Sequence, residues 1–188
     1  EFESFNGIRP DHQTILPFTR LMGGPMDYTP GIFEGDLSVY GSNKAKLGTT
    51  LVKQLALYVT MYSPLQMAAD LYQNYEKYPD AFQFIKDVAV DGDNEPGDYI
   101  TIARKAKGKN EWYIGGITDE NSREAVIDLS FLPAGKKYQA TIYADGKTAD
   151  WRTNPKEYVI STKKVTNKTK LKQRLAPSGG VAVSIKEL

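Results

Sequence analysis

The side chains best suited to chemistry gather in the stretch 7–34, which reads GIRPDHQTILPFTRLMGGPMDYTPGIFE. It holds the only histidine of the chain, His12, directly after Asp11, and four of the ten prolines. Proline and glycine at this density interrupt helices and strands, so we expect a loop-rich surface. An Asp-His pair there can position a polar ligand, with the imidazole donating to a ligand hydroxyl. A loop histidine that bonds to backbone is the alternative, and the residue types leave both open.

Arg20 and Asp27 flank the Gly-Gly-Pro break of the same stretch. A charge-assisted pair between them would tie the turn at 24–31 to the segment before it, which favours a structural role. Other chemistries find no support. The chain has no cysteine, a single histidine gives no metal-ligand spacing, and the sequence contains neither a phosphate-binding glycine loop nor a nucleophile elbow.

Helices are expected to hold this stretch in place. The strongest pattern covers 49–61, where apolar residues recur at three- and four-residue spacing and Thr49 or Thr50 can act as N-cap. Thr14 is a candidate N-cap for a shorter helix that would end at Gly23-Gly24. Pro79 is well placed as the first residue of another. The four helices are expected at 15–22, 49–61, 65–75 and 79–87.

After Asp91 the helical periodicity gives way to short β runs with turn residues between them. Seven such runs at this spacing are typical of an antiparallel β-sandwich. The change places a domain boundary near residue 91. The strands are expected at 99–103, 112–118, 124–129, 138–144, 158–162, 170–175 and 181–185.

Composition narrows the classes of partner. The chain has 188 residues, enough to bury a sizeable core, and a formal net charge of +1, so no overall field favours nucleic acid. No apolar run reaches membrane-spanning length, and no basic and then apolar segment marks a signal peptide at the start. We therefore expect neither nucleic acid nor a membrane span among the partners.

The order of the motifs is more specific than the composition. Glu-Phe-Glu at 1–3 is followed by Pro-Asp-His, Pro-Phe-Thr-Arg and Gly-Pro-Met-Asp-Tyr-Thr-Pro-Gly, and then by LVKQLALYVTMYSPLQMAAD and GDYITIAR. This series closely resembles glycoside hydrolase family 97, the bacterial α-glucosidases and α-galactosidases, and is nearest to the starch-utilisation α-glucosidases among them. The resemblance spans most of the chain.

The resemblance implies a fold. In that family a β-sandwich precedes a catalytic (β/α)8 barrel, and a smaller sandwich closes the chain. Residues 1–90 would then be the C-terminal part of the barrel and 91–188 the C-terminal β-sandwich, so the expected fold class is α/β plus all-β. The abrupt opening on EFESF, without an initiator methionine, fits a cleaved or excised C-terminal piece. The connection at 90–96 is shorter than in the family and lacks its Trp-Asp pair.

The resemblance also implies site residues. Glu1 aligns with the glutamate that in the family protonates the glycosidic oxygen, and a cluster of glutamates there binds calcium, so Glu1 is also a possible metal ligand. A solvated terminal glutamate is the alternative. Asp11 and His12 become candidate substrate-binding residues. The implied function is hydrolysis of the α-glucosidic bonds of starch-derived maltooligosaccharides in the periplasm.

Two further expectations follow for this chain. The second catalytic carboxylate lies upstream of Glu1 in the family, so the chain alone is expected to be inactive and to need the upstream segments of the same enzyme as partners. A different class of function stays open: a non-catalytic carbohydrate-binding or structural β-sandwich with a helical appendage. Trp112, Trp151 and tyrosines exposed on one face would favour it, because they could stack on sugar rings.

Overall fold

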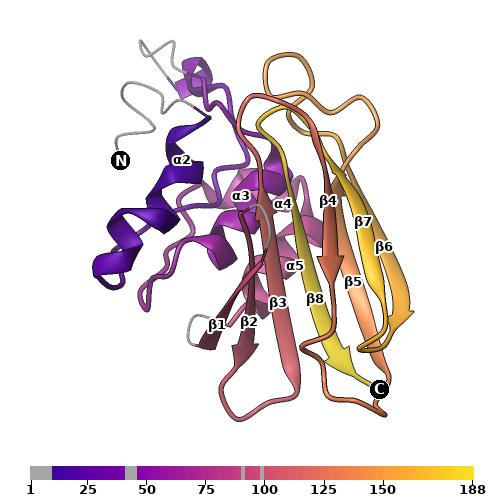
Figure 1. The fold of residues 1–188 in the computed structure, drawn as a ribbon. Coiled ribbons are helices and arrows are strands. Elements are labelled where there is room, and N and C mark those ends of the chain that lie inside the picture. The colour runs from indigo at the N-terminus through magenta and orange to yellow at the C-terminus, as the bar shows by residue number, and fades with distance from the viewer. Residues whose placement is uncertain (1–9, 41–45, 90–91, 98–99) are drawn as a thin grey trace.

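The computed structural model describes residues 10–40, 46–89 and 100–188 with their side chains, and the backbone of 92–97. Figure 1 shows a large antiparallel sheet with the helices on one side of it. Glu1 and the connection at 90–91 and 98–99 lie outside the described residues. In the described part, no helix is long and apolar enough to cross a membrane.

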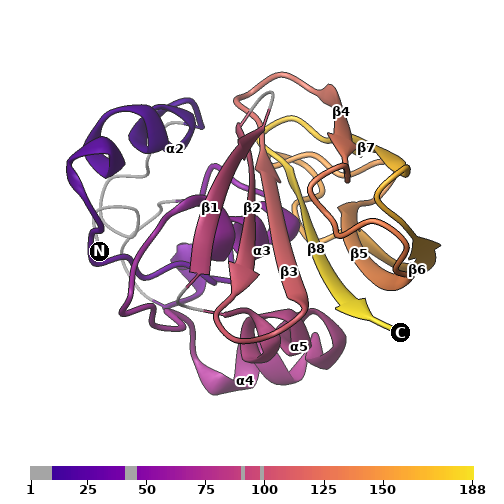
Figure 2. The same cartoon turned by 60° about the horizontal axis from the view of Figure 1, so that its bottom comes forward.

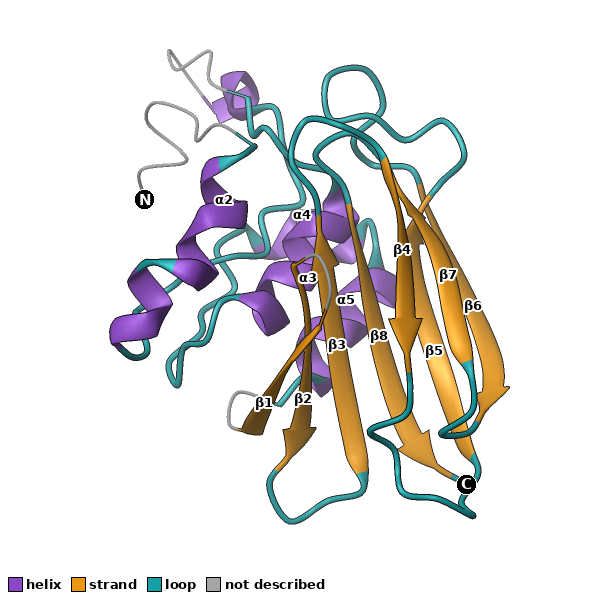
Figure 3. Cartoon of the chain, viewed as in Figure 1, coloured by secondary structure: helices purple, strands orange, loops and turns teal. Residues whose placement is uncertain are grey.

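The two best helical patterns are confirmed. The helix expected at 49–61 has Thr50 as its N-cap, whose Oγ1 accepts from the backbone N–H of Lys53 at 3.1 Å. The helix expected at 79–87 starts on Pro79 as predicted. The helices are α2 (His12–Ile15), α3 (Leu51–Thr60), α4 (Tyr72–Glu76) and α5 (Pro79–Asp87), with 3-10 turns at Leu16–Phe18, Arg20–Gly23 and Leu37–Tyr40 (Figure 3).

Two helix predictions are wrong in part. The helix expected at 15–22 is replaced by the end of α2 and two 3-10 turns, with Pro17 in the first, where it removes a backbone donor. Thr14 lies inside α2 and its hydroxyl donates to the carbonyl of Asp11. The helix expected at 65–75 begins only at Tyr72. Before it, Gln66 forms a parallel β-bridge with Tyr28.

All seven predicted strand regions are found, and an eighth strand, β1, precedes them. Six strands form an antiparallel sheet in the order β1-β2-β3-β8-β5-β6, and β4 pairs with β7 in a second sheet. Pro96 lies in β1 at the sheet edge, where a missing N–H is tolerated. The strands are β1 (Gly92–Gly97), β2 (Ile100–Ala106), β3 (Glu111–Ile117), β4 (Arg123–Asp128), β5 (Tyr138–Asp145), β6 (Tyr158–Val165), β7 (Lys170–Leu175) and β8 (Gly180–Glu187).

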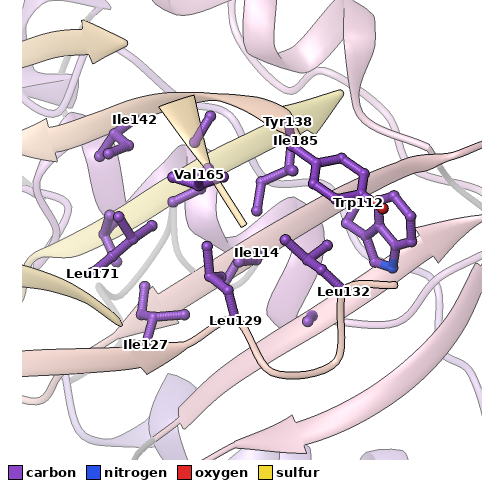
Figure 4. Packing of buried hydrophobic residues seen from close by; sticks show 14 of the residues in the cluster. Trp112, Ile114, Ile127, Leu129, Leu132, Tyr138, Ile142, Val165, Leu171 and Ile185 are labelled. Carbon is purple, nitrogen blue, oxygen red and sulfur yellow. The ribbon is translucent and has the colours of Figure 1, made fainter. Parts of the chain in front are cut away.

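The two sheets enclose an apolar core, part of which Figure 4 shows. Trp112 is only 5% exposed and meets Tyr138 edge to face, with 5.3 Å between ring centroids. Trp112 is therefore not one of the exposed rings that would favour the carbohydrate-binding alternative. Successive side chains of β3 point to opposite faces, so Trp112 faces the core between the two sheets and Tyr113 faces the helices.

A second core lies between the large sheet and the helices. All ten residues of α3 are buried, and Leu55, Tyr58 and Val59 share one cluster with Tyr113 and Ala182 of the sheet. Figure 2 shows α3 behind β2 and β3. A helix that is apolar nearly all round is stable only when it is enclosed on all sides.

Two glycines of the sheet allow this close packing. A Cβ on Gly115 of β3 would lie 2.5 Å from the carbonyl oxygen of Ala56, and one on Gly180 of β8 would lie 3.0 Å from the Cα of Lys53. Backbone meets backbone at this contact, so both positions require glycine. The described residues thus form a mostly antiparallel β-sheet domain with few helices, and they contain no complete (β/α)8 barrel.

Candidate functional site

The candidate site is the surface built by the stretch 10–34 on the helical side of the sheet. Asp11 and His12 lie at the start of α2, where the carbonyl of Asp11 accepts from the backbone N–H of Thr14 at 3.0 Å. The His12 side chain is exposed, whereas its neighbour Gln13 is 2% exposed. The structure therefore presents the imidazole outward and anchors the helix through the next residue.

Gln13 connects this helix to the turn that follows. Its Nε2 donates to the hydroxyl of Tyr28 at 3.4 Å, and Tyr28 forms the parallel bridge with Gln66. Gln66 in turn donates to the carbonyls of Tyr58 and Met61 at 2.8 and 3.0 Å, at the C-terminal end of α3. These bonds hold the segment after α3 extended, which is why no helix forms there.

Lys53 of α3 fixes the start of the same surface, at Pro10. Its side chain is fully buried, and Nζ donates to the carbonyls of Pro10 and Thr118 at 3.1 and 2.9 Å and to the hydroxyl of Ser178 at 3.2 Å. Burying an ammonium group is costly unless its hydrogen bonds are made. The three acceptors come from three distant segments, so the residue before Asp11 is joined to the sandwich.

The turn at the end of the stretch is held by four side chains. Gln54 Oε1 accepts from the N–H groups of Gly31 and Ile32 at 2.9 and 3.3 Å, and Tyr58 donates to the carbonyl of Pro30 at 3.0 Å. Gly31 has a φ of +94°, and a Cβ there would lie 2.5 Å from the Tyr58 hydroxyl oxygen. Only glycine combines that backbone conformation with so close a contact.

Asp70 completes the clamp from the other side. Its Oδ2 accepts from the N–H groups of Phe33 and Glu34 at 2.7 and 2.8 Å, and its Oδ1 accepts from Asn74 Nδ2 at 2.7 Å. Tyr75 donates to the carbonyl of Gly31 at 2.8 Å. The four backbone N–H groups of residues 31–34 and the carbonyls of Pro30 and Gly31 thus bond to side chains, which gives the surface one defined shape.

A buried carboxylate joins the helix to the sandwich. Asp145 accepts from Thr50 Oγ1 at 2.7 Å and from the N–H groups of Ala176 and Gly180 at 2.9 and 2.8 Å. Burial raises the pKa of Asp145 to about 6, although these three hydrogen bonds and the charge of Arg174 act in the opposite direction. The carboxylate therefore titrates in the weakly acidic range.

Arg104 of β2 is the unusual charge of this region. It is 1% exposed, its guanidinium carbon lies 5.0 Å from the ring centroid of Tyr62, and no hydrogen bond to its three side-chain nitrogens occurs among the residues that the structure describes. Burial lowers the pKa of Arg104 to about 10. Its contact with the tyrosine ring is a cation–π interaction, which offsets only part of the desolvation cost.

The sequence-derived pairing of Arg20 with Asp27 is wrong. Arg20 Nη1 donates instead to the carbonyl of Gly24 at 3.3 Å, and Asp27 is exposed. Gly24 directly follows the 3-10 turn Arg20–Gly23, so its carbonyl lies only four residues from Arg20. Among the described residues, no group of three or more histidine and carboxylate side chains could hold a metal ion. The calcium site expected at Glu1 stays a prediction.

Four residues that build or anchor the site were not predicted from the sequence: Lys53, Gln54, Asp70 and Asp145. One signal was present: Lys53 and Gln54 interrupt an apolar helical run at neighbouring positions, so one of them had to face a buried side of α3. Asp70 follows an extended segment and Asp145 is the last residue of β5, and neither carries such a signal.

Comparison with known proteins defines the class. A family model described as "Glycosyl-hydrolase 97 C-terminal, oligomerisation" matches residues 86–186. The solved structure of a glycoside hydrolase family 97 enzyme from Pseudoalteromonas sp. strain K8, in complex with acarbose, matches with a TM-score of 0.90 and 46% identity over 96% of this chain and 29% of that one. The fold is therefore that of the C-terminal part of a glycoside hydrolase.

Curated relatives agree. A retaining α-galactosidase of Bacteroides thetaiotaomicron is 37% identical over 98% of this chain, and a probable retaining α-galactosidase of Streptomyces bingchenggensis is 32% identical over 63% of it. The chain spans 30% and 18% of the lengths of these two relatives. A β-arabinopyranosidase structure matches with a TM-score of 0.70 and 25% identity over 92% of this chain and 27% of that one. The chain belongs to glycoside hydrolase family 97.

Proposed function

We propose that this chain is the C-terminal part of an α-glycosidase that hydrolyses neutral oligosaccharides, and that residues 1–90 form the last elements of its catalytic (β/α)8 barrel. The observation that carries this is the likeness to family 97 enzymes along 96–98% of the chain, so that the helical part and the sandwich are both included. Membership of the family supports glycosidase activity for the protein of which this chain would be a part.

The local geometry supports the barrel assignment. Tyr28 and Gln66 are joined by a parallel bridge, and α3 lies between them in sequence, as a crossover helix does between neighbouring barrel strands. The clamped turn at 30–34 follows the first of these strand segments, and Asp70 follows the second. Loops after the strands are where barrel enzymes bind substrate. The turn and Asp70 would then form part of the substrate-binding end.

Exposed apolar side chains support the need for further segments. Among the residues that the structure describes, nine of the twelve large exposed apolar ones lie between Ile15 and Tyr72, including Phe18 at 60% and Met22 at 81% exposure. A soluble domain seldom leaves so much apolar surface uncovered in one region. The upstream segments of the same enzyme would cover it.

Within this proposal Glu1 is the general acid and a possible calcium ligand, Asp11 and His12 contact substrate, and the enzyme works in the periplasm. The exposed imidazole of His12 suits contact with a ligand, while Glu1 rests on the family resemblance. Two sets of relatives bear on the identity of the sugar. The structures that match at 46% identity bind acarbose and panose, whereas the curated relatives are α-galactosidases.

The deciding experiment uses the parent enzyme with nitrophenyl α-glucoside and nitrophenyl α-galactoside as competing substrates. We expect hydrolysis of the glucoside to dominate, because the more similar structures bind glucose-type ligands. A ratio of kcat/KM in favour of the galactoside would overturn the glucosidase assignment and keep the glycosidase. Hydrolysis of neither substrate would remove the proposed activity.

A further inference from the structure

A cleft of about 290 Å³ lies where the segment after the clamped turn meets the loop between β5 and β6. Its volume is at the lower end of small-molecule sites. Asp11 and His12 are not among the residues that line it. Its charged and aromatic lining residues are Glu34, Asp36 and Lys46 on one side and Trp151, Arg152 and Lys156 on the other.

The loop that carries Trp151 is rigid. The backbones of Asp150 and Asn154 bond to each other in both directions at 3.2 and 2.8 Å, and Asp150 Oδ1 accepts from the N–H groups of Arg152 and Thr153 at 2.8 and 3.2 Å. The Asn154 side chain donates to Glu157 Oε2 at 3.0 Å. A loop backbone held this firmly loses little conformational entropy when a ligand stacks on the ring that it carries.

The two walls are also tied to each other. Lys156 Nζ donates to both carboxylate oxygens of Glu34 at 2.7 and 2.8 Å, and the carbonyl of Pro155 accepts from the N–H of Leu51 at 2.8 Å. Glu34 is the last residue of the turn that Asp70 clamps, so the cleft takes its shape from the same network as the candidate site. The cleft is formed before any ligand arrives.

The charges of the cleft are mostly compensated. Lys156 forms an ion pair with Glu34, and Lys46 Nζ lies 3.6 Å from Asp36 Oδ2. The guanidinium carbon of Arg152 lies 4.6 Å from the Trp151 ring centroid, over one face of the indole. Paired cations and carboxylates around an aromatic ring offer both donors and acceptors to hydroxyl groups, without the concentrated positive field that a polyanion needs.

We propose that this cleft binds a neutral oligosaccharide, with one hexopyranose ring packed on Trp151 and its hydroxyls bonded to the surrounding ion pairs. The site deepens the proposed function, since it rests on sugar as the class of ligand. It assigns to the chain a binding role that does not use Glu1. Trp151 is its central contact, and the pairs Lys156–Glu34 and Lys46–Asp36 fix the orientation of the ring.

The chain offers a direct readout. It contains two tryptophans, and Trp112 is buried in the sandwich core, so a change in indole emission on adding sugar reports on Trp151. Maltotriose and raffinose are titrated separately into the 188-residue chain, followed by fluorescence and by isothermal titration calorimetry. We expect saturable binding of one of them, with a dissociation constant of about a millimolar.

Trp151→Ala should weaken binding by calorimetry at least about tenfold, and Trp151→Phe should lose less because it keeps an aromatic face. Tyr72→Ala is the matched control, since it removes a 67% exposed aromatic ring that does not line the cleft. Far-UV circular dichroism checks that every variant folds. Equal affinity in wild type and Trp151→Ala, or no saturable binding of either sugar, overturns the site.

AMP is the competing ligand, because a base can also stack on Trp151 while Arg152 binds its phosphate. Binding of AMP more tightly than either sugar overturns the assignment to neutral oligosaccharides. Hydrolysis by the parent enzyme is measured separately. If the parent enzyme cleaves α-glycosides but the chain binds no sugar at Trp151, only the proposed binding site in the cleft is overturned. If the chain binds sugar at Trp151 but the parent hydrolyses no α-glycoside, only the proposed glycosidase activity is overturned.

Discussion

Thr50 and Asp145 are 95 positions apart in sequence and joined by a buried hydrogen bond of 2.7 Å. The same threonine hydroxyl caps α3 by accepting from the N–H of Lys53. The start of the central helix and the end of β5 are therefore fixed by one side chain. Because the acceptor is a titratable carboxylate, the strength of this joint depends on pH.

The first prediction concerns that dependence. Burial raises the pKa of Asp145 from 3.8 to about 6 in the folded chain, and unfolding restores the lower value. Between these values the folded state binds more protons than the unfolded one, so the contribution of Asp145 to stability is greatest at low pH and falls as pH rises through about 6. Asp145→Asn removes this titration.

Urea denaturation of wild type and Asp145→Asn at a series of pH values tests this. The free energy of unfolding of wild type minus that of the variant should decrease between about pH 4 and 6 and level off above it. Asp27→Asn, at an exposed carboxylate, serves as the control for a general charge effect. A difference that rises with pH over this interval contradicts the prediction.

The second prediction concerns Lys53. In Lys53→Met the carbonyls of Pro10 and Thr118 and the hydroxyl of Ser178 lose a buried donor. We expect the free energy of unfolding to fall by about 2–4 kcal/mol, as buried acceptors are left unpaired. Urea denaturation measures it, with Lys163→Met on the exposed side of β6 as the control. Equal losses of unfolding free energy in the two variants would show that the hydrogen bonds of the buried Lys53 ammonium do not stabilise the fold.

The third prediction is a substitution that raises the free energy of unfolding. Arg104 is buried over Tyr62, and among the described residues no hydrogen bond reaches its guanidinium group. Arg104→Met should raise the free energy of unfolding of the 188-residue chain by about 1–3 kcal/mol, because the desolvation cost disappears and the apolar packing remains. Arg123→Met is the control, since Arg123 forms an exposed ion pair with Asp119. A loss of stability in Arg104→Met would contradict the prediction.

The fourth prediction concerns activity of the isolated chain. A glycosidase needs two carboxyl groups about the scissile bond, and the family resemblance places one of them upstream of Glu1. The purified 188-residue chain should therefore not hydrolyse nitrophenyl α-glucoside or nitrophenyl α-galactoside. A colorimetric assay over many hours, with the parent enzyme as positive control, is sufficient. Turnover that follows the chain through two chromatographic steps would disprove it.

The fifth prediction concerns Glu1 in the parent enzyme. Glu1→Gln keeps the shape but removes the proton that a general acid delivers, so maltose hydrolysis should fall by about a hundredfold to ten-thousandfold. Aryl glycosides and glycosyl fluorides have good leaving groups and should lose much less. A calcium titration of the same variant separates the two roles of Glu1. Equal losses on all substrates, with unchanged calcium affinity, would return Glu1 to a solvated or positional role.

Local signals predicted much of the fold. Apolar periodicity and a threonine cap marked α3, Pro79 marked α5, and turn residues between β runs marked seven strands. The failures have tertiary causes. The segment 65–71 is extended because Gln66 reaches back to the carbonyls at the end of α3, and nothing in its own sequence shows that.

The site was less predictable than the fold. The sequence pointed to Asp11 and His12, and the structure places them at the start of α2, but the pairing of Arg20 with Asp27 was wrong. The residues that shape the surface are Lys53, Asp70 and Asp145, whose partners lie up to 125 positions away. Sequence distance carries no information on such contacts, so polar residues of this kind are recognised only once the fold is known.

The enclosure of α3 has a consequence for motion. The helix touches the sheet so closely that Gly115 and Gly180 leave no room for a side chain, and its ends are fixed through Thr50 and through the carbonyls that Gln66 binds. Hinge bending needs a few residues that absorb a change in backbone dihedrals without breaking packed contacts. None of the ten residues of α3 offers this freedom. We therefore expect α3 and the large sheet to move together, so that any motion at the proposed active site falls to the loops.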